Sequence, residues 1–288
     1  YLNIILKNKS IEERLTTNIK DINPLINISV HEIPEVMDIW IRDWAPLPVV
    51  NDKGEATLIK AIYRPAYIKN KDLVFADGDD LAGRKLSEIL KLPLIILPLI
   101  LDFGNFTNNG KGTGIVTERI LKDNPEHSKN EIENLFSEII GITKLIIIPE
   151  EPGDVTGHVD GTIRFITPEI LAISQYPEKY TEENKFLGDL EKIIINEMDN
   201  KFRIIRIMNG PIRNDSSEGI GNAWGNHMNY FIAGNKLYLP CYGIKEDELA
   251  KQTLKNELNE FEIISVDTPE ISNLAKKGGV LNCMSWCI

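Results

Sequence analysis

Residues 145–173 read LIIIPEEPGDVTGHVDGTIRFITPEILAI, and no other stretch says as much about the fold. Three short apolar runs lie in it, at residues 145–148, 163–166 and 170–173, and runs of this length and composition are typical of β-strands. Between the first two runs stands Gly157-His158-Val159-Asp160-Gly161, in which glycines let the backbone turn sharply. The stretch therefore predicts strands joined by a loop that carries an imidazole and a carboxylate.

The rest of the chain alternates short strands with helices. Further apolar runs at residues 94–97, 237–239 and 263–266 predict strands. The clearest helix spans residues 128–140, where Ser128 and Glu131 match a capping box ahead of an apolar stripe. Other helices are expected at residues 80–92, 181–198 and 245–258, and from Pro269 to a stop at Gly278. The expected class is mixed α/β, and because no linker interrupts the chain, residues 1–288 are expected to form a single catalytic domain.

A nucleophile lies far along the chain from this loop. Cys283 follows the glycine pair Gly278-Gly279, and a thiol combined with an imidazole and a carboxylate suits covalent catalysis. Polar residues just beyond a predicted strand recur at comparable intervals, and Cys283 is the last of them; the full set is Asp43, Asp102, His158, Asn229 and Cys283. A closed ring of five supersecondary repeats would bring these five residues to a common centre.

Composition excludes some classes of partner. The net charge of −11 and the pI near 5.0 argue against nucleic acid or an anionic membrane and favour a cationic ligand. Three cysteines make a disulfide framework unlikely and indicate a reducing compartment, so a cytoplasmic location is expected. The longest apolar run, residues 92–101, is interrupted by prolines and is too short to span a bilayer. The chain begins at Tyr1 without a methionine, so its start says nothing about a leader.

Four segments resemble the agmatine deiminase and bacterial peptidylarginine deiminase family: residues 40–46 (WIRDWAP), 102–106 (DFGNF), 154–161 (DVTGHVDG) and 278–283 (GGVLNC). The resemblance implies a pentein fold, which is a five-bladed, pseudo-symmetric α/β propeller with a central active site. It also implies hydrolysis of a guanidino group to a ureido group and ammonia without a cofactor. Within that family, Trp40, Asp43 and Asn229 would contact the substrate, although Asn229 matches the pattern only loosely.

The residues suit this chemistry. A guanidinium is planar and always protonated at neutral pH, so two carboxylates are needed to hold it, and Asp102 and Asp160 are the expected pair. Cys283 would attack the carbon, ammonia would leave with a proton from His158, and a covalent thiouronium would remain for water to hydrolyse. Negative charge near Cys283 should raise the pKa of its thiol, so the thiolate is expected to form chiefly when the cationic substrate is bound.

Other motifs point to structure rather than chemistry. His158-Val159-Asp160 contains two potential metal ligands, but no further ligands stand at a recognisable spacing, and no metal is expected. Gly110-Lys111-Gly112-Thr113-Gly114 departs from the phosphate-loop pattern and predicts a hairpin turn. Cys241 and Cys287 are expected to be small buried apolar residues.

Departures from the family pattern leave the substrate open. Asp102 stands where agmatine enzymes more often have Glu, Phe103 replaces a Gly, and Asn282 precedes the cysteine where His is common. Agmatine, converted to N-carbamoylputrescine for putrescine biosynthesis, is the expected substrate, with arginyl peptides and free arginine as alternatives. An amidinotransferase would use the same intermediate, and a non-catalytic binding module would need no nucleophile. The first blade is expected to be incomplete, and a homo-oligomer is possible.

Overall fold

The same unit of secondary structure recurs four times along the chain: an antiparallel pair of strands, then helix, then a third strand parallel to the second. The protein is seen in a computed structural model that describes residues 2–64, 67–68, 73–198, 202–213 and 221–288. The four three-stranded sheets comprise β3 (Leu47–Val50), β4 (Ala56–Ile62) and β5 (Leu94–Ile100); β6 (Thr107–Asn108), β7 (Thr113–Thr117) and β8 (Lys144–Ile148); β9 (Ile163–Thr167), β10 (Ile170–Gln175) and β11 (Arg203–Met208); and β12 (Phe231–Ala233), β13 (Lys236–Pro240) and β14 (Glu262–Val266).

The first sheet differs from the other four. It contains β1 (Leu2–Leu6) and β2 (Ile28–Glu32), which are parallel and are joined through helix α1 (Glu12–Ile22). Among the described residues it therefore has two strands where the other sheets have three.

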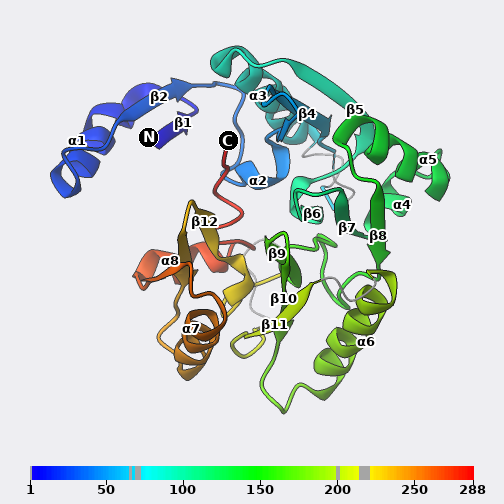
Figure 1. The fold of residues 1–288 in the computed structure, drawn as a ribbon. Helices are drawn as coiled ribbons and strands as arrows, with labels where there is room; N and C mark the ends of the chain where they lie inside the picture. Colours follow the sequence, from blue (N-terminus) through cyan, green and yellow to red (C-terminus); the bar gives the residue numbers. More distant parts are fainter. Residues whose placement is uncertain (1, 65–66, 69–72, 199–201, 214–220) are drawn as a thin grey trace.

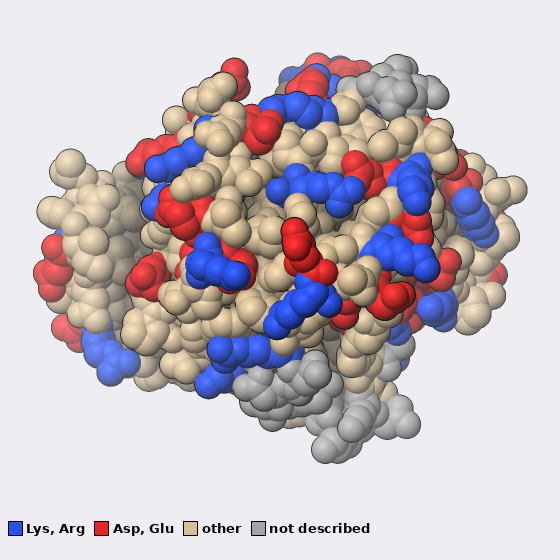
Figure 2. Space-filling view, turned by 90° about the horizontal axis from the view of Figure 1, so that it is seen from below, with Lys and Arg blue, Asp and Glu red and all other residues tan. Residues whose placement is uncertain are grey.

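The five sheets follow one another around a common centre (Figure 1). Helices lie toward the outside of this arrangement, including α3 (Leu73–Leu90), α5 (Lys129–Leu135), α6 (Thr181–Glu197) and α7 (Lys245–Glu257). The predicted mixed α/β class is confirmed. None of the described helices is long and apolar enough to cross a membrane. Acidic and basic side chains lie interspersed over the face of the molecule that Figure 2 shows.

Most predicted elements lie where the sequence pattern indicated, with small changes at their ends. The capping box of Ser128 and Glu131 is formed, although the helix continues after Leu135 as a π-helical turn, Phe136–Ile140. Helix α8 (Pro269–Ala275) begins at the expected proline. Residues 110–114 form part of the hairpin between β6 and β7, as predicted.

The predicted start of the helix at residue 80 is wrong, because α3 already includes Leu73. The aspartates at the predicted start lie within the helix and bond to residues of other elements. Asp79 accepts hydrogen bonds from the backbone N–H groups of Met37 and Asp38, and Asp80 pairs with the buried Lys60. Both side chains therefore connect α3 to other parts of the fold.

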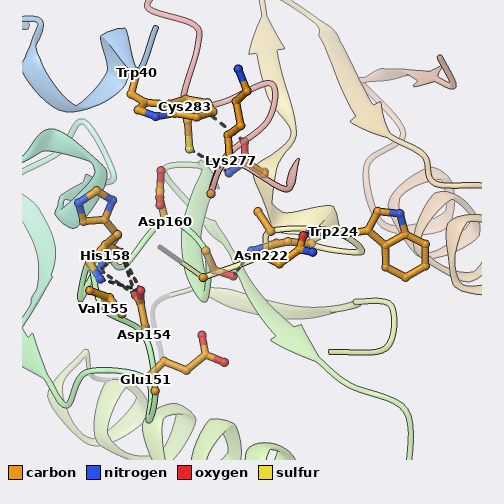
Figure 3. A pocket seen from close by; sticks show the side chains of 18 of the residues that line it. Trp40, Glu151, Asp154, Val155, His158, Asp160, Asn222, Trp224, Lys277 and Cys283 are labelled. Atoms are coloured by element: carbon orange, nitrogen blue, oxygen red, sulfur yellow. Dashed lines mark hydrogen bonds between the residues drawn. The ribbon is translucent and has the colours of Figure 1, made fainter. Parts of the chain in front are cut away.

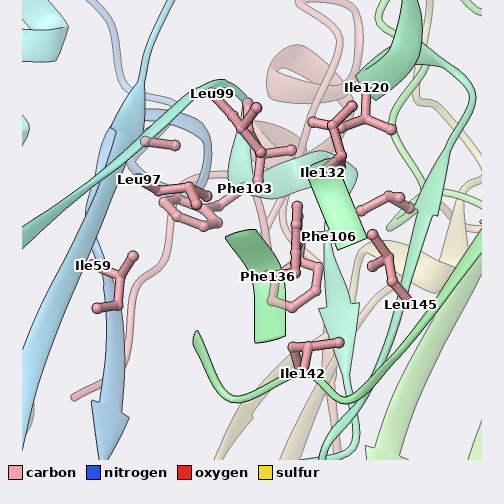
Figure 4. Packing of buried hydrophobic residues seen from close by; sticks show 13 residues of the cluster. Ile59, Leu97, Leu99, Phe103, Phe106, Ile120, Ile132, Phe136, Ile142 and Leu145 are labelled. Atoms are coloured by element: carbon pink, nitrogen blue, oxygen red, sulfur yellow. The ribbon is translucent and has the colours of Figure 1, made fainter. Parts of the chain in front are cut away.

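A buried apolar cluster anchors one of the loops that reach the centre (Figure 4). Phe103 and Phe106 lie in this cluster, which extends across the sheets β3–β5 and β6–β8, and the rings of Phe106 and Phe136 meet edge to face at 5.4 Å. Truncating a buried phenylalanine to alanine costs about 3–5 kcal/mol of stability. The loop that begins at Asp102 and carries both rings is therefore held firmly in place.

Candidate active site

All seven residues singled out in the sequence lie in segments that follow the last strand of a sheet. Trp40 and Asp43 lie between β2 and β3, Asp102 between β5 and β6, His158 and Asp160 between β8 and β9, Asn229 between β11 and β12, and Cys283 after α8. Four of these segments run from the last strand of one sheet to the first strand of the next, and the fifth follows β14 and α8, so the ring of sheets brings segments that are distant in sequence together.

These connections surround a cavity of about 850 Å³. Six of the seven predicted residues line it, namely Trp40, Asp43, His158, Asp160, Asn229 and Cys283. Figure 3 shows Cys283 beside the ring of Trp40, with Asp160 and His158 on the neighbouring wall. A thiol, an imidazole and two carboxylates therefore share one cavity.

Asn229 holds the loop that carries the nucleophile. Its side-chain Nδ2 lies 3.1 Å from Cys283 Sγ, and its Oδ1 accepts hydrogen bonds from the backbone N–H groups of Val280 (3.2 Å), Asn282 (2.9 Å) and Cys283 (3.4 Å). One amide thus bonds both the sulfur and the backbone around it. The sequence assigned Asn229 to substrate contact, whereas its described bonds organise this loop.

Glycine is required next to the nucleophile. A Cβ built on Gly279 would lie 2.8 Å from the ring of Trp40 and 2.9 Å from Cys283 Sγ, closer than real Cβ atoms approach other atoms. The same holds at Gly104, where a Cβ would lie 2.4 Å from Asp43 Oδ1 and 2.5 Å from His158 Nδ1. These glycines let the backbone come close enough for the side chains to meet.

His158 lies between two aspartates. Its Nε2 is 3.2 Å from Asp102 Oδ2, and its Nδ1 is 3.7 Å from Asp43 Oδ1. Tyr67, whose ring packs edge-on against the imidazole, donates a hydrogen bond to the same Asp102 oxygen at 3.1 Å. Asp102 is therefore engaged by His158 and Tyr67.

The expected pairing of Asp102 with Asp160 around the substrate differs from the observed geometry. Asp102 is absent from the described lining of the cavity, while Asp43 and Asp160 are both part of it. Asp43 Oδ1 is buried and has no hydrogen-bond partner among the described residues. Asp43 and Asp160 thus share the described lining of the cavity, whereas Asp102 contacts the imidazole.

Burial and charge shift the pKa values of the reacting groups. Burial alone would lower the pKa of His158, but the facing carboxylates of Asp43 and Asp102 outweigh it and raise that pKa to about 10. Burial, together with the charges of Asp160 and Asp43, raises the pKa of the Cys283 thiol. Burial also raises the pKa of Asp43 well above its usual value. Without a bound cation, the site therefore holds a neutral thiol and an imidazolium.

Sequence reasoning missed several residues of the site. Tyr67 was not singled out, because a lone tyrosine outside a motif gives no local signal. Asp154 lines the cavity, and its carboxylate accepts bonds from Thr156 and from the backbone N–H of His158, so it shapes the loop that carries the imidazole. Asn282, noted only as a departure from the family pattern, bonds to Asp160.

Acidic residues outnumber basic ones among the other described residues that line the cavity. Its acidic lining residues beyond the reacting centre are Asp38, Glu151, Asp154 and Glu183, and its basic ones are Arg213 and Lys277. Glu151 accepts hydrogen bonds from the hydroxyls of Tyr176 and Thr162, and burial raises the pKa of its carboxyl. Among the described residues, no group of three or more His, Cys, Asp or Glu side chains is arranged to hold a metal ion.

Comparison with known proteins places this geometry in context. The model of the Porphyromonas-type peptidyl-arginine deiminase family matches residues 2–288. A Mycoplasma mycoides protein provisionally named an agmatine deiminase is 28% identical over 274 residues, covering 86% of this chain and 74% of that protein.

Solved structures share the fold. The C. jejuni agmatine deiminase with substrate bound has a TM-score of 0.79 at 21% identity, over 98% of this chain and 80% of that one. The agmatine deiminase of Enterococcus faecalis has a TM-score of 0.77 at 20% identity, over 98% and 81% of the two chains. At these identities the likeness establishes the fold, and it confirms the fold class predicted from the sequence.

Proposed function

The chain belongs to the Porphyromonas-type peptidyl-arginine deiminase family, and from that premise we propose that it hydrolyses the guanidino group of agmatine to a ureido group and ammonia. The observation that carries the proposal is the convergence of Cys283, His158, Asp43 and Asp160 on one cavity. Such an enzyme is a hydrolase of C–N bonds, and its product would be N-carbamoylputrescine, a precursor of putrescine.

Binding comes first in the proposed mechanism. The guanidinium lies between Asp43 and Asp160, whose carboxylates accept its N–H groups and fix its plane. The substrate supplies the partner that Asp43 Oδ1 lacks. Its positive charge offsets the two carboxylate charges that raise the pKa of Cys283, so binding promotes loss of the thiol proton.

Two chemical steps follow. The thiol proton passes to solvent, Cys283 Sγ bonds to the guanidinium carbon, the tetrahedral adduct collapses, and ammonia leaves with a proton from His158, so that a thiouronium remains on the sulfur. Water then gives a proton to the now neutral His158 and adds to the same carbon. The C–S bond breaks with its electron pair passing to sulfur, and the ureido product loses its remaining proton to solvent, which leaves the thiolate and the imidazolium. Asp102 keeps the imidazole oriented through both steps, a role supported by its 3.2 Å contact with Nε2.

The acidic residues of the cavity support agmatine as the substrate. Agmatine ends in an ammonium group, which suits a lining whose described acids, among them Asp154 and Glu183, outnumber the cations of Arg213 and Lys277. Free arginine would bring a carboxylate toward the same acids.

The three free cysteines, Cys241, Cys283 and Cys287, are compatible with a reducing compartment, and we propose a cytoplasmic location.

A panel of guanidino compounds tests this function. Ammonia release is measured with agmatine, free arginine and an arginyl peptide, with and without an added acceptor amine. We expect kcat/KM to be about 100-fold higher for agmatine than for arginine, because a misplaced charge costs several kcal/mol. A higher value for the peptide would overturn the choice of substrate, a requirement for the amine would indicate an amidinotransferase, and no release from any compound would overturn the deiminase itself.

The pH dependence offers a second test. With Cys283 as the group that must lose a proton and His158 as the group that must keep one, kcat/KM is expected to rise with pH through the neutral range. The value should stop rising near the His158 pKa of about 10, because a further rise in pH then removes imidazolium as fast as it produces Cys283 thiolate. A profile whose rise ends below pH 7 would contradict this assignment.

A further inference from the structure

Asn282 stands directly before the nucleophile and is almost completely buried, at 2% exposure. Its side-chain Nδ2 donates a hydrogen bond of 2.7 Å to Asp160 Oδ2. Its backbone is fixed as well, because its N–H donates to Asn229 Oδ1 at 2.9 Å and its carbonyl accepts from Arg42 Nε at 3.4 Å. The backbone of Asn282 is therefore fixed by two hydrogen bonds, and its side-chain amide points at the carboxylate of Asp160, which lines the cavity.

The other end of this amide has no partner. Asn282 Oδ1 is buried and makes no hydrogen bond among the described residues. A buried polar atom without a partner costs about 1–3 kcal/mol, and an apolar side chain of the same shape would avoid that cost. Fold stability alone therefore gives no reason for an asparagine here. The reason lies in the Nδ2 group of Asn282, which donates to the carboxylate of Asp160.

We propose that Asn282 is a positioning residue that holds Asp160 by one oxygen, so that the other oxygen faces the substrate guanidinium. This inference rests on the proposed deiminase function and describes how this chain prepares that site. An amide is neutral at every pH of interest, so it orients the carboxylate without cancelling the negative charge that attracts the cation. A cationic side chain at residue 282 would instead form an ion pair with Asp160 and compete with the substrate.

The titratable groups around Asp160 come from four segments of the chain. Arg42 and Asp43 lie between β2 and β3, and His158 lies between β8 and β9 together with Asp160. Tyr230 lies between β11 and β12, and Cys283 lies after α8. Asn282 is the uncharged group in direct contact with the Asp160 side chain through a described hydrogen bond. The effect of its donor can therefore be separated from theirs by changing residue 282 alone.

The test replaces Asn282 by leucine, which keeps the volume and removes the donor. We expect kcat/KM for agmatine to fall about 10- to 100-fold, mainly through a higher KM, as for the loss of a hydrogen bond to a charged group. The melting temperature should change little, because the unpartnered Oδ1 is removed too. Asn124→Leu is the matched control: Asn124 is fully buried but is bonded at both ends to residues outside the site, so this variant should lose stability and keep its KM.

Asn282→Asp supplies a readout that a merely structural role would not give. A protonated aspartate at residue 282 can still donate to Asp160, whereas an ionised one repels the Asp160 carboxylate. The loss of kcat/KM relative to the native protein should therefore grow as pH rises. The deficit of Asn282→Leu should stay constant with pH. A pH-independent deficit of the aspartate variant would overturn the proposal, and this variant keeps the test possible if the leucine variant does not fold.

Agmatine binding can also be followed by a readout other than ammonia release, which separates this inference from the proposed function. In a Cys287→Ala background, the agmatine concentration that halves the rate of Cys283 alkylation by iodoacetamide reports binding. We expect this concentration to rise about 10-fold or more in Asn282→Leu. If the native protein releases no ammonia, the proposed function fails while this measurement still decides the role of Asn282. A protection constant and KM within twofold of the native values would overturn that role.

Discussion

Replacing Cys283 by alanine is expected to lower the rate of ammonia release from agmatine by about 10⁴-fold or more, since loss of a catalytic nucleophile removes the covalent route entirely. The fold should survive this change. The described side-chain contact of the sulfur is the one with Asn229 Nδ2, and alanine is small enough for the space beside Gly279. Ammonia release is measured with native and variant proteins at equal concentration, and circular dichroism checks that both are folded.

The control is Cys287→Ala, four residues further along the same segment. The expectation that Cys287 is buried is wrong, because its side chain is exposed. It also does not line the cavity. This variant should keep native activity within about twofold, as is usual for surface substitutions. The assignment of the nucleophile fails if Cys283→Ala retains more than a small fraction of the native rate, or if the two variants lose activity equally.

Removing the charge of either carboxylate in the cavity should have the second largest effect. For Asp160→Asn and Asp43→Asn, we expect kcat/KM to fall about 10²- to 10³-fold, because the guanidinium loses one partner of a buried ion pair. The two variants should also make Cys283 more reactive toward iodoacetamide. The charges of Asp160 and Asp43 both raise the pKa of the thiol, so removing one lowers that pKa, although burial keeps it above the ordinary value.

These opposite changes distinguish an electrostatic role from simple damage to the site. A disordered site would lose turnover without a defined change in thiol chemistry, whereas the proposed clamp predicts slower turnover together with faster alkylation. Asp43→Asn should not lower the melting temperature, because burial of the Asp43 carboxylate disfavours its charged form in the folded state. Asp189→Asn, on the exposed face of α6, should change neither rate. Turnover within tenfold of the native value in both cavity variants would refute the clamp.

The chemistry of the site was readable from sequence because it resides in short segments. Cys283 beside a glycine pair and His158 and Asp160 between glycines are patterns within a few residues, and the structure brings these three to one cavity. Strands and most helices were predictable for the same reason, since apolar periodicity, the capping box at Ser128 and Pro269 act locally. A tertiary contact was needed to show that Asp79 and Asp80 bond outside their own helix.

The division of labour among the polar residues was decided by tertiary structure. Sequence identified Asp43, Asp102 and Asp160 as acids near the chemistry, but which of them faces the cavity depends on how separate connections pack together. Buried Phe103 and Phe106 fix the loop after Asp102, and that carboxylate meets His158 and Tyr67, leaving Asp43 and Asp160 in the lining.

The same limit explains the two asparagines. Nothing near Asn229 in sequence shows that its amide would bond Cys283, and nothing near Asn282 shows that it would reach Asp160, because each partner comes from another part of the ring. Sequence alone therefore determined the local elements and the kinds of reacting group. The direction of each side chain, and with it the role of each residue, was settled only where distant loops meet, since a loop side chain takes the orientation that its neighbours in space leave open to it.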